Sequence, residues 1–521
     1  MPVLAEHLSL PYVLLREVTV PADVIRKVPA KLAHHYEIVP VAMQANALAI
    51  AIHDPTDTHK LDEIQMMLGI SIAPQLAARK DILEALKRYY GIGAETVETM
   101  MKESESESSL ALDQPVAEDI QTLAEDASII TFVNQIMLEA YHDRATDIHV
   151  EPYQDELKIR YRIDGILHDA NVPPNIRRFQ AAIVSRIKIM AHLNIAERRL
   201  PQDGRIKVKI GDEELDLRVS ILPTPFGESV CIRLLSGANT FFGLDKLGLD
   251  AGYLKTLQHL ILKPHGIILL TGPTGSGKTT TLYAFLTELN KADKKIITIE
   301  DPIEYQIAGI TQIQVHPKID LTFSRGLRSM LRHDPDIMMV GEIRDLETAE
   351  ITIRVALTGH LVFSTLHTND AASAVARLVD MGVESYLVAS SVECIIAQRL
   401  LRTLCPHCKT LVAPPADFHK EIAAMGHKMG RKNSAEVGAP KGCNRCKGTG
   451  YFGRAAIHEI LVVDDNLRSL IVQRLQANAI REKAIAKGMR TLRQDGWRKA
   501  ILGETSIDEV LRVTQESEIV D

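Results

Sequence analysis

A glycine-rich loop between an apolar run and a helical pattern constrains the fold of this chain more than any other feature. Residues 272–279 read Gly-Pro-Thr-Gly-Ser-Gly-Lys-Thr, which matches the pattern GxxxxGK[ST] in full. Residues 267–270 before the loop are apolar, and a helical pattern begins near Lys278. A P-loop needs this strand before it and this helix after it. We therefore predict a P-loop at the end of a strand in a mostly parallel α/β sheet.

The residue types of this loop suit a nucleotide. Glycines let backbone N–H groups face phosphate oxygens, and the helix N-terminus adds a favourable dipole. The Lys278 ammonium would neutralise the β- and γ-phosphates, and the Thr279 hydroxyl would bind Mg²⁺. A glycine-rich turn without a ligand is the alternative, but it does not account for the strand and the helix. We expect the nucleotide to contact Gly272, Pro273, Thr274, Gly275, Ser276, Gly277, Lys278, Thr279 and Thr280.

Carboxylates follow two later apolar runs of the same block. The run 296–299 is followed by Glu300, Asp301 and Glu304, and the run 337–340 is followed by Glu342. The carboxyl ends of parallel strands gather beside the ligand, so these groups are expected near the γ-phosphate. Solvated loop acids are the alternative for any one of them, but together they favour a catalytic cluster.

Two basic features of this block are ambiguous. His367 stands at the carboxyl end of a third apolar run, where a γ-phosphate sensor would lie, although a lone histidine is more often an ordinary polar residue. Arg325, Arg328 and Arg332 fall at i, i+3 and i+7 on one helical face. An ion-paired surface stripe explains these arginines equally well.

Four cysteines form two Cys-x-x-Cys pairs: Cys405 with Cys408, and Cys443 with Cys446. Four thiolates suit a tetrahedral structural Zn²⁺. A redox pair is the alternative, and the presence of two pairs argues against it. We predict a zinc site that closes the stretch 409–442.

Overall composition limits the classes of function. Hydrophobic residues make up 46% of the chain and charged residues 24%, as in an ordinary globular protein. The net charge of −7 and an aromatic content of 4% argue against a nucleic-acid-translocating motor, which needs a basic channel or stacking aromatics. No apolar run reaches the roughly 18 residues of a transmembrane helix, and the first residues lack the basic region of a signal peptide. We expect a cytoplasmic protein that meets the membrane through a partner.

Four motifs, in this order, resemble the ATPases of type II secretion and type IV pilus assembly. They are the P-loop, an aspartate box at 299–304, an atypical Walker B at 338–345 with Gly341 before the glutamate, and a histidine box at 364–370. The resemblance extends from about residue 120 onward. It implies an α/β, multidomain protein in which a RecA-like P-loop ATPase domain follows an α+β (PAS-like) domain and a small N-terminal α/β domain, with a zinc-binding insertion and C-terminal helices.

Periodicity and this resemblance together divide the chain into six parts. The acidic, aperiodic part is predicted to be a flexible linker. The alternating strands of the next part place arginines on one face. The predicted parts are an N-terminal partner-docking domain (1–97), the linker (98–118), an α+β domain (119–240), the ATPase domain (241–400), a tetracysteine subdomain (401–453) and a C-terminal helical region (454–521).

The resemblance also implies roles for the acids. Glu300 and Glu304 would position or deprotonate water, and Glu342 would assist at Mg²⁺; which glutamate is the general base stays open. An intact Lys278 and these acids argue against a non-hydrolysing ATP-binding adaptor. The implied cofactors are ATP, Mg²⁺ and Zn²⁺.

Members of this family form homo-hexameric rings and bring arginines from the second domain to the nucleotide, in cis or in trans. Arg205, Arg218 and Arg233 match these arginines best. An arginine beside the γ-phosphate is physically sensible, because catalysis of phosphoryl transfer is largely electrostatic.

The N-terminal part and the cysteine pairs narrow the resemblance further. The first resembles the single compact domain by which a type II secretion ATPase docks on the cytoplasmic domain of a GspL-like inner-membrane protein; a GspF-like platform protein is also implied. The cysteine pairs favour a secretion or pilus-extension ATPase over a pilus-retraction ATPase. The resemblance thus implies export through a type II secretion system by pseudopilus assembly, with type IV pilus extension as the alternative. Residues 6–10 lack the arginine and glycine of related cyclic di-GMP sites, so that ligand is not expected.

Overall fold

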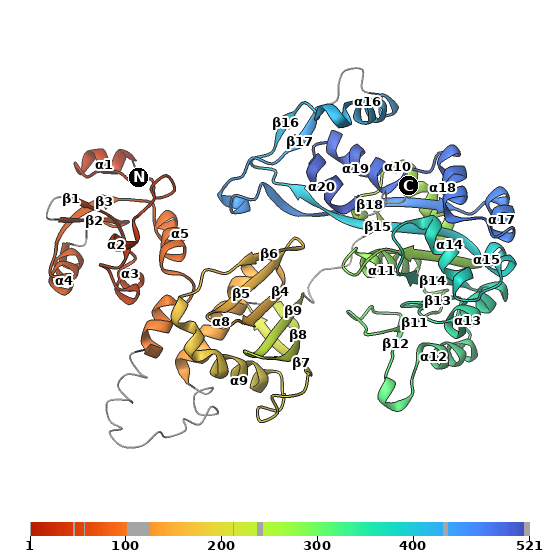
Figure 1. Cartoon of the computed structure of the whole chain (residues 1–521), viewed down its shortest axis with the longest axis horizontal. Helices are drawn as coiled ribbons and strands as arrows, with labels where there is room; N and C mark the ends of the chain where they lie inside the picture. The colour runs from red at the N-terminus through yellow and green to blue at the C-terminus, as the bar shows by residue number, and fades with distance from the viewer. Residues whose placement is uncertain are drawn as a thin grey trace. The chain divides into compact units, whose positions relative to one another are not determined.

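The structure is a computed structural model that divides into two compact units, Met1–Gly237 and Ala238–Asp521 (Figure 1). Among the residues that it describes, no helix is both long and apolar enough to cross a lipid bilayer. The described residues are 2–44, 47–56, 58–101, 126–211, 213–236, 243–430 and 436–514.

The N-terminal part of unit 1 is a small three-stranded sheet with short helices around it. The middle strand is an apolar run whose residues 48–52 are buried. It pairs antiparallel with β1 and parallel with β3. The helix α5 ends at Tyr90, just before Gly91. The elements are α1 (Pro2–His7), α2 (Ala22–Ile25), α3 (Ala30–Tyr36), β1 (Val39–Gln44), β2 (Ala47–Ile52), α4 (Thr58–Leu68), β3 (Ser71–Leu76) and α5 (Arg79–Tyr90).

The second part of unit 1 is a six-stranded antiparallel sheet. Alternate residues such as Leu215, Leu217 and Val219 are buried against α8 and α9, so the other face of the sheet is polar. The strand order is β6-β5-β4-β9-β8-β7. The elements are α8 (Ala127–His142), β4 (Ala145–Pro152), β5 (Leu157–Ile163), β6 (Ile166–Asp169), α9 (Gln180–Met190), β7 (Gln202–Ile210), β8 (Glu213–Thr224) and β9 (Gly227–Ser236).

The predicted boundary after residue 97 falls inside a packed helix. Residues 94–101 are helical, and Val97 and Met100 are buried in the same core as Phe132 of α8. The ordered structure therefore extends four residues into the predicted linker. The acidic composition of the following residues obscured these buried apolar side chains. The rest of that linker lies outside the described residues.

Unit 2 is built on a seven-stranded sheet in the order β12-β11-β13-β14-β10-β15-β18. All neighbours are parallel except β15 and β18. Central strands are buried on both faces, which is why they read as continuous apolar runs. The predicted α/β fold class is confirmed. The first strands are β10 (Gly266–Thr271), β11 (Ile296–Glu300), β12 (Thr311–Gln314), β13 (Ile337–Val340) and β14 (Leu361–Leu366).

Helices cover both faces of this sheet (Figure 1). One face packs on α10 and α11, and the other on α13 to α15 and the C-terminal helices. The helices are α10 (Ala251–Ile261), α11 (Lys278–Leu289), α12 (Phe323–Met330), α13 (Leu346–Leu357), α14 (Ala371–Asp380), α15 (Ser385–Ser391), α17 (Asp465–Val472), α18 (Ala477–Ala486), α19 (Leu492–Ile501) and α20 (Ile507–Thr514).

Two long strands cross the predicted boundaries at 400 and 454. β15 (Val392–Leu404) and β18 (Tyr451–Val462) pair along almost their whole length and complete the sheet. The tetracysteine segment between them, with β16 (Thr410–Val412), α16 (His419–Lys428) and β17 (Val437–Ala439), is thus an insertion into unit 2. The C-terminal helices share a core with the sheet rather than forming a region of their own.

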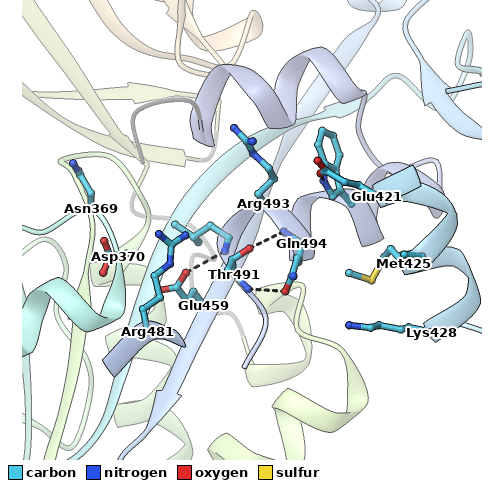
Figure 2. Close-up of a pocket in the computed structure, with 13 residues that line it drawn as sticks. Asn369, Asp370, Glu421, Met425, Lys428, Glu459, Arg481, Thr491, Arg493 and Gln494 are labelled. Atoms are coloured by element: carbon cyan, nitrogen blue, oxygen red, sulfur yellow. Dashed lines mark hydrogen bonds between the residues drawn. The ribbon is translucent and has the colours of Figure 1, made fainter. Parts of the chain in front are cut away.

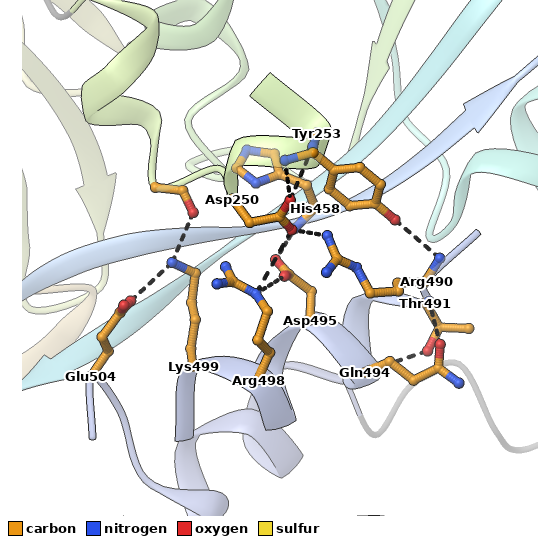
Figure 3. A network of polar contacts seen from close by, with 12 residues as sticks. Asp250, Tyr253, His458, Arg490, Thr491, Gln494, Asp495, Arg498, Lys499 and Glu504 are labelled. Atoms are coloured by element: carbon orange, nitrogen blue, oxygen red, sulfur yellow. Dashed lines mark hydrogen bonds and ion pairs between the residues drawn. The ribbon is translucent and has the colours of Figure 1, made fainter. Parts of the chain in front are cut away.

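A polar network ties the start of unit 2 to α19 (Figure 3). Asp250 caps α10 and forms an ion pair with Arg490. The Arg490 backbone N–H donates to the Tyr253 hydroxyl at 3.0 Å, and Arg498 pairs with Asp495 at 2.9 Å. Because these charges neutralise one another, they can be half-buried at this junction.

Candidate nucleotide and metal sites

The P-loop connects β10 to α11, as predicted. Gly272 has a φ of +146°, and a Cβ atom there would lie 2.5 Å from the Gln398 carbonyl oxygen. Gly277, with a φ of +86°, is the left-handed N-cap of α11. The loop can therefore approach β15 and turn into the helix only with glycine at these two positions.

Lys278 lies in the first turn of α11 and folds over the loop. Its Nζ donates to the carbonyl oxygens of Gly272 at 2.8 Å and Pro273 at 3.1 Å. Burial, together with the charge of Arg399, lowers the pKa of Lys278 to about 8, against the opposing effect of Glu342. A phosphate beside this ammonium would offset both unfavourable effects and hold it protonated.

Glu342 and His367 meet beside the P-loop lysine. Glu342 follows β13, His367 follows β14, and the P-loop follows β10, so all three leave the same edge of the sheet. The Glu342 carboxylate lies 3.4 Å from His367 Nε2 and 2.5 Å from Arg344 Nη2. The Glu342 side chain is only 12% exposed, so its charge acts on this edge with little screening by water.

Glu300 is held more tightly than a solvated loop acid. Its carboxylate accepts hydrogen bonds from Tyr283, from Thr298 at 2.6 Å and from Gln312 at 3.1 Å. Burial, together with the charge of Glu300, raises the pKa of the Tyr283 phenol far above its usual range. Glu304 lies nearby, and its backbone N–H donates to the Tyr283 hydroxyl at 3.4 Å. Glu300 thus anchors the start of the aspartate box.

Two residues of β15 complete the loop, and sequence reasoning missed both. Gln398 is buried, donates from Nε2 to the Ser276 carbonyl at 2.9 Å and accepts from the Thr281 hydroxyl at 2.8 Å. Arg399 donates from Nη2 to the backbone and side-chain oxygens of Asn369 at 3.1 and 3.2 Å. The signal was a polar pair directly after an apolar run; it lies where β15 passes the end of β10, because Thr271 pairs with Ala397.

The three predicted arginines belong to unit 1 and form a row across its sheet. Arg205, Arg218 and Arg233 are direct cross-strand partners on β7, β8 and β9. The row continues through Asp147 to Arg162. Direct partners in an antiparallel sheet point to the same face, and here it is the polar one. Arg233 Nε lies 2.9 Å from Asp147, whereas Arg205 has only a 4.0 Å contact with Asp216.

The three arginines of the predicted stripe lie on α12 and the short turn after it, and they have local partners. Arg325 pairs with Asp320 at 2.5 Å, and Arg328 pairs with Glu347 at 2.6 Å. Arg332 donates to the Arg328 carbonyl at 3.0 Å. These contacts support the ion-paired surface alternative for this stripe.

The four predicted cysteines converge in the insertion. Their sulfur atoms all lie within 4.8 Å of one another, with separations of 3.8, 3.8 and 3.7 Å for three of the pairs. Zinc–sulfur bonds of about 2.3 Å in a tetrahedron place sulfurs about 3.8 Å apart, so the donor set fits zinc. Burial opposes ionisation of Cys446, but hydrogen bonds from the Cys443 and Gly450 N–H groups outweigh it and lower its pKa to about 7.

Known families and structures agree with this architecture. A family described as Type II/IV secretion system protein matches residues 122–512. The chain belongs to this family. A second family, the MshEN domain, matches residues 8–96. The predicted family is thus confirmed.

Several curated proteins resemble the chain over most of their length. Type II secretion system protein E of Xanthomonas campestris pv. campestris is 44% identical over 98% of this chain and 90% of its own. Type II secretion system ATPase E of Vibrio cholerae is 48% identical over 84% of each chain. The type IV pilus assembly ATPase PilB of Myxococcus xanthus is 42% identical over 98% of this chain and 89% of its own.

A solved structure shares the fold. The ATPase DotB of Legionella pneumophila matches 74% of this chain and 96% of its own with a TM-score of 0.55, at 21% sequence identity. At this identity the match concerns the fold alone.

Proposed function

We propose that the chain hydrolyses ATP to power protein export through a type II secretion system by driving pseudopilus assembly. The observation that carries this proposal is the meeting of Lys278, Glu342 and His367 at the carboxyl ends of three parallel strands. Family membership and the secretion ATPases among the relatives support it. ATP would lie along the P-loop, in contact with the nine residues from 272 to 280.

Each polar group at this edge has a proposed role. Lys278 neutralises the β- and γ-phosphates, Thr279 binds Mg²⁺, and Glu342 assists at the metal and orients the attacking water. His367, held by Glu342, senses the γ-phosphate. The Glu300 carboxylate already accepts three hydrogen bonds, so it acts by positioning the aspartate box, and Glu304 is proposed to position or deprotonate water.

The arginine row supplies positive charge from the second domain. Arg205, Arg218 and Arg233 would stabilise charge that develops on the γ-phosphate, in the same chain or in a neighbouring copy. A homo-hexamer would provide such neighbours. Hexameric assembly is a property that the resemblance implies, and it is part of this proposal.

Zinc is proposed as a structural ion. Cys405, Cys408, Cys443 and Cys446 would hold it, and the metal would fix the fold of the insertion between β15 and β18. Structural zinc contributes stability without taking part in the hydrolysis.

The proposed setting is the cytoplasmic side of the inner membrane. Residues 1–97 would dock on the cytoplasmic domain of a GspL-like protein, and a GspF-like protein would receive the motion. Extension of a type IV pilus is the second candidate, since the pilus assembly ATPase of Myxococcus xanthus is about as similar to this chain as the secretion relatives.

The test is phosphate release by the purified chain, alone and with the cytoplasmic domain of a GspL-like partner. We expect hydrolysis that the partner stimulates and that Lys278→Ala and Glu342→Ala abolish. Lys291→Ala, at an exposed lysine just after α11, is the matched control and should leave the rate unchanged. ATP binding without hydrolysis under every condition would contradict the proposal and favour an ATP-binding adaptor.

A further inference from the structure

A cavity of about 380 Å³ lies in unit 2, and none of the residues that line it belongs to the P-loop (Figure 2). Its walls come from the loop after β14, from α16 of the cysteine insertion, from β18, and from α18 and α19. Cavities of this size accommodate small organic molecules. The residues that decide its chemistry are three carboxylates, three cations and an apolar wall.

The carboxylates of this cavity are already engaged by the protein. Asp370 caps α14 by accepting from the Ser373 N–H at 2.7 Å. Glu421 accepts from Trp497 Nε1 at 2.9 Å. Glu459 accepts from two backbone N–H groups, of Ala371 at 2.9 Å and of Leu492 at 3.4 Å, and burial raises its pKa. These acids therefore have reduced capacity to attract a cation from solution.

Two of the cations, Arg481 and Lys428, are less engaged with the described residues. The Arg481 Nε is buried and has no hydrogen-bond partner among the described residues. Lys428, at the end of α16, is exposed and forms no ion pair with any residue that the structure describes. Arg493 donates to the Thr514 hydroxyl at 3.3 Å, a neutral partner. An unpaired buried guanidinium nitrogen costs free energy that an anion would recover.

An apolar wall faces these charges. Met425 of α16 and Leu492 and Trp497 of α19 line the same space. We propose that this cavity binds a small molecule that carries one compact oxyanion, a phosphate or a carboxylate, on an aromatic or apolar body. The oxyanion contacts Arg481 and Lys428, and the body packs against Trp497.

The cavity has a direct connection to the P-loop. Asn369 lines it and accepts two hydrogen bonds from Arg399, whose charge acts on Lys278. A ligand that displaces Asn369 thus alters the electrostatics of the loop, so the site is an effector site. This coupling rests on the proposed ATPase function, whereas binding itself does not.

Trp497 makes binding directly measurable, because it is the only tryptophan in the chain. Purified full-length protein is titrated with phenyl phosphate, benzoate, inorganic phosphate and benzylamine while its fluorescence is followed. We expect a saturable change with phenyl phosphate or benzoate, and none with benzylamine, whose charge has the wrong sign. A response to inorganic phosphate of equal affinity would contradict the need for an apolar body.

Matched variants distinguish binding in this cavity from non-specific binding of an anion to surface charges. Arg481→Gln and Lys428→Gln should each weaken binding about tenfold, which corresponds to the loss of a charged hydrogen bond of about 1.4 kcal/mol. Lys420→Gln, at an exposed lysine on the same helix that does not line the cavity, should leave the affinity unchanged. No saturable signal, or equal affinity in Arg481→Gln and wild type with both folded, would overturn the proposal. Because this titration needs no ATP, its failure is distinguishable from failure of the proposed ATPase function.

Discussion

Two charged regions of this molecule are built in opposite ways. At the P-loop edge of unit 2, polar groups come from loops at the ends of parallel strands and are engaged with one another around Glu342, which is 12% exposed. On the polar face of unit 1, arginines come from the middles of antiparallel strands; Arg205 and Arg233 are about half exposed, and Arg218 is partly buried. We call the first region the socket; it comprises the P-loop, Glu342 and His367. The second region, the arginine row, is a positively charged surface that can bind an anion from outside unit 1.

The difference shows in how each region satisfies its charges. Glu342 has two basic neighbours and Glu300 three hydrogen-bond donors. In the arginine row, one carboxylate, Asp147, stands among four arginines. We interpret the socket as the place that binds the nucleotide, and the row as a source of charge for the transition state.

The largest effect on the rate of hydrolysis is expected at the socket. Lys278→Ala should lower phosphate release at least 100-fold, about 2.7 kcal/mol, because it removes the charge that faces the β- and γ-phosphates. Steady-state kinetics would measure it. A rate within fivefold of wild type would place the nucleotide elsewhere.

Removal of zinc should affect the cysteine insertion but neither of the two charged regions. Cys405→Ser, or treatment with a strong chelator, should release zinc and expose the stretch 409–442 to protease. Structural zinc contributes about 10–16 kcal/mol in small zinc-binding units. Zinc content and limited proteolysis measure the outcome, with Cys231→Ser as the control cysteine outside the cluster. Full zinc content in Cys405→Ser would show that the four thiolates are not the ligands.

Gln398 tests whether the socket depends on β15. Gln398→Ala should weaken ATP binding about tenfold, because it removes two buried hydrogen bonds to the loop and to α11. Equilibrium binding of a fluorescent ATP analogue would measure the change. Gln398→Glu keeps the acceptor for Thr281 but loses the donor to Ser276, so it should fall between alanine and wild type. Unchanged affinity in both variants would mean that the P-loop holds its shape without β15.

The smallest effect concerns a buried histidine that belongs to neither region. Burial lowers the pKa of His458 to about 4, so the ring is neutral in the fold (Figure 3). The unfolded chain takes up this proton near pH 6.5. Stability is therefore full above about pH 6.5 and falls by roughly 1 kcal/mol per unit as the pH drops toward 4. Urea unfolding between pH 7 and 5 measures this slope, which His458→Gln should reduce by that amount; an unchanged slope would contradict the assignment.

The socket was predictable because its information is local. The P-loop, Glu342 and His367 each stand directly after an apolar run, and parallel strands bring such ends together. Gln398 was missed because it lies inside β15, which continues past residue 400, and it reaches the P-loop only where β15 passes the end of β10. The helix at 94–101 was missed because its buried residues Val97 and Met100 adjoin a strongly acidic segment.

The sequence predicted which arginines form the row, but not that they lie side by side across three strands. Alternation along each strand places the arginines on one face, but their alignment depends on the register of three strands separated by turns. A shift of one residue would move an arginine to the buried face. Single-sequence patterns do not specify that register, whereas apolar packing against α8 and α9 does.

The most direct test of this account removes the row and leaves the socket intact. In the variant Arg205→Gln/Arg218→Gln/Arg233→Gln, ATP binding and phosphate release are measured together, beside Lys207→Gln/Lys209→Gln on the same strand as control. The account predicts ATP affinity within a few-fold of wild type, a rate of phosphate release at least 100-fold lower, and an unaffected control. Undiminished phosphate release in the folded triple variant would contradict it, because the socket would then catalyse hydrolysis alone.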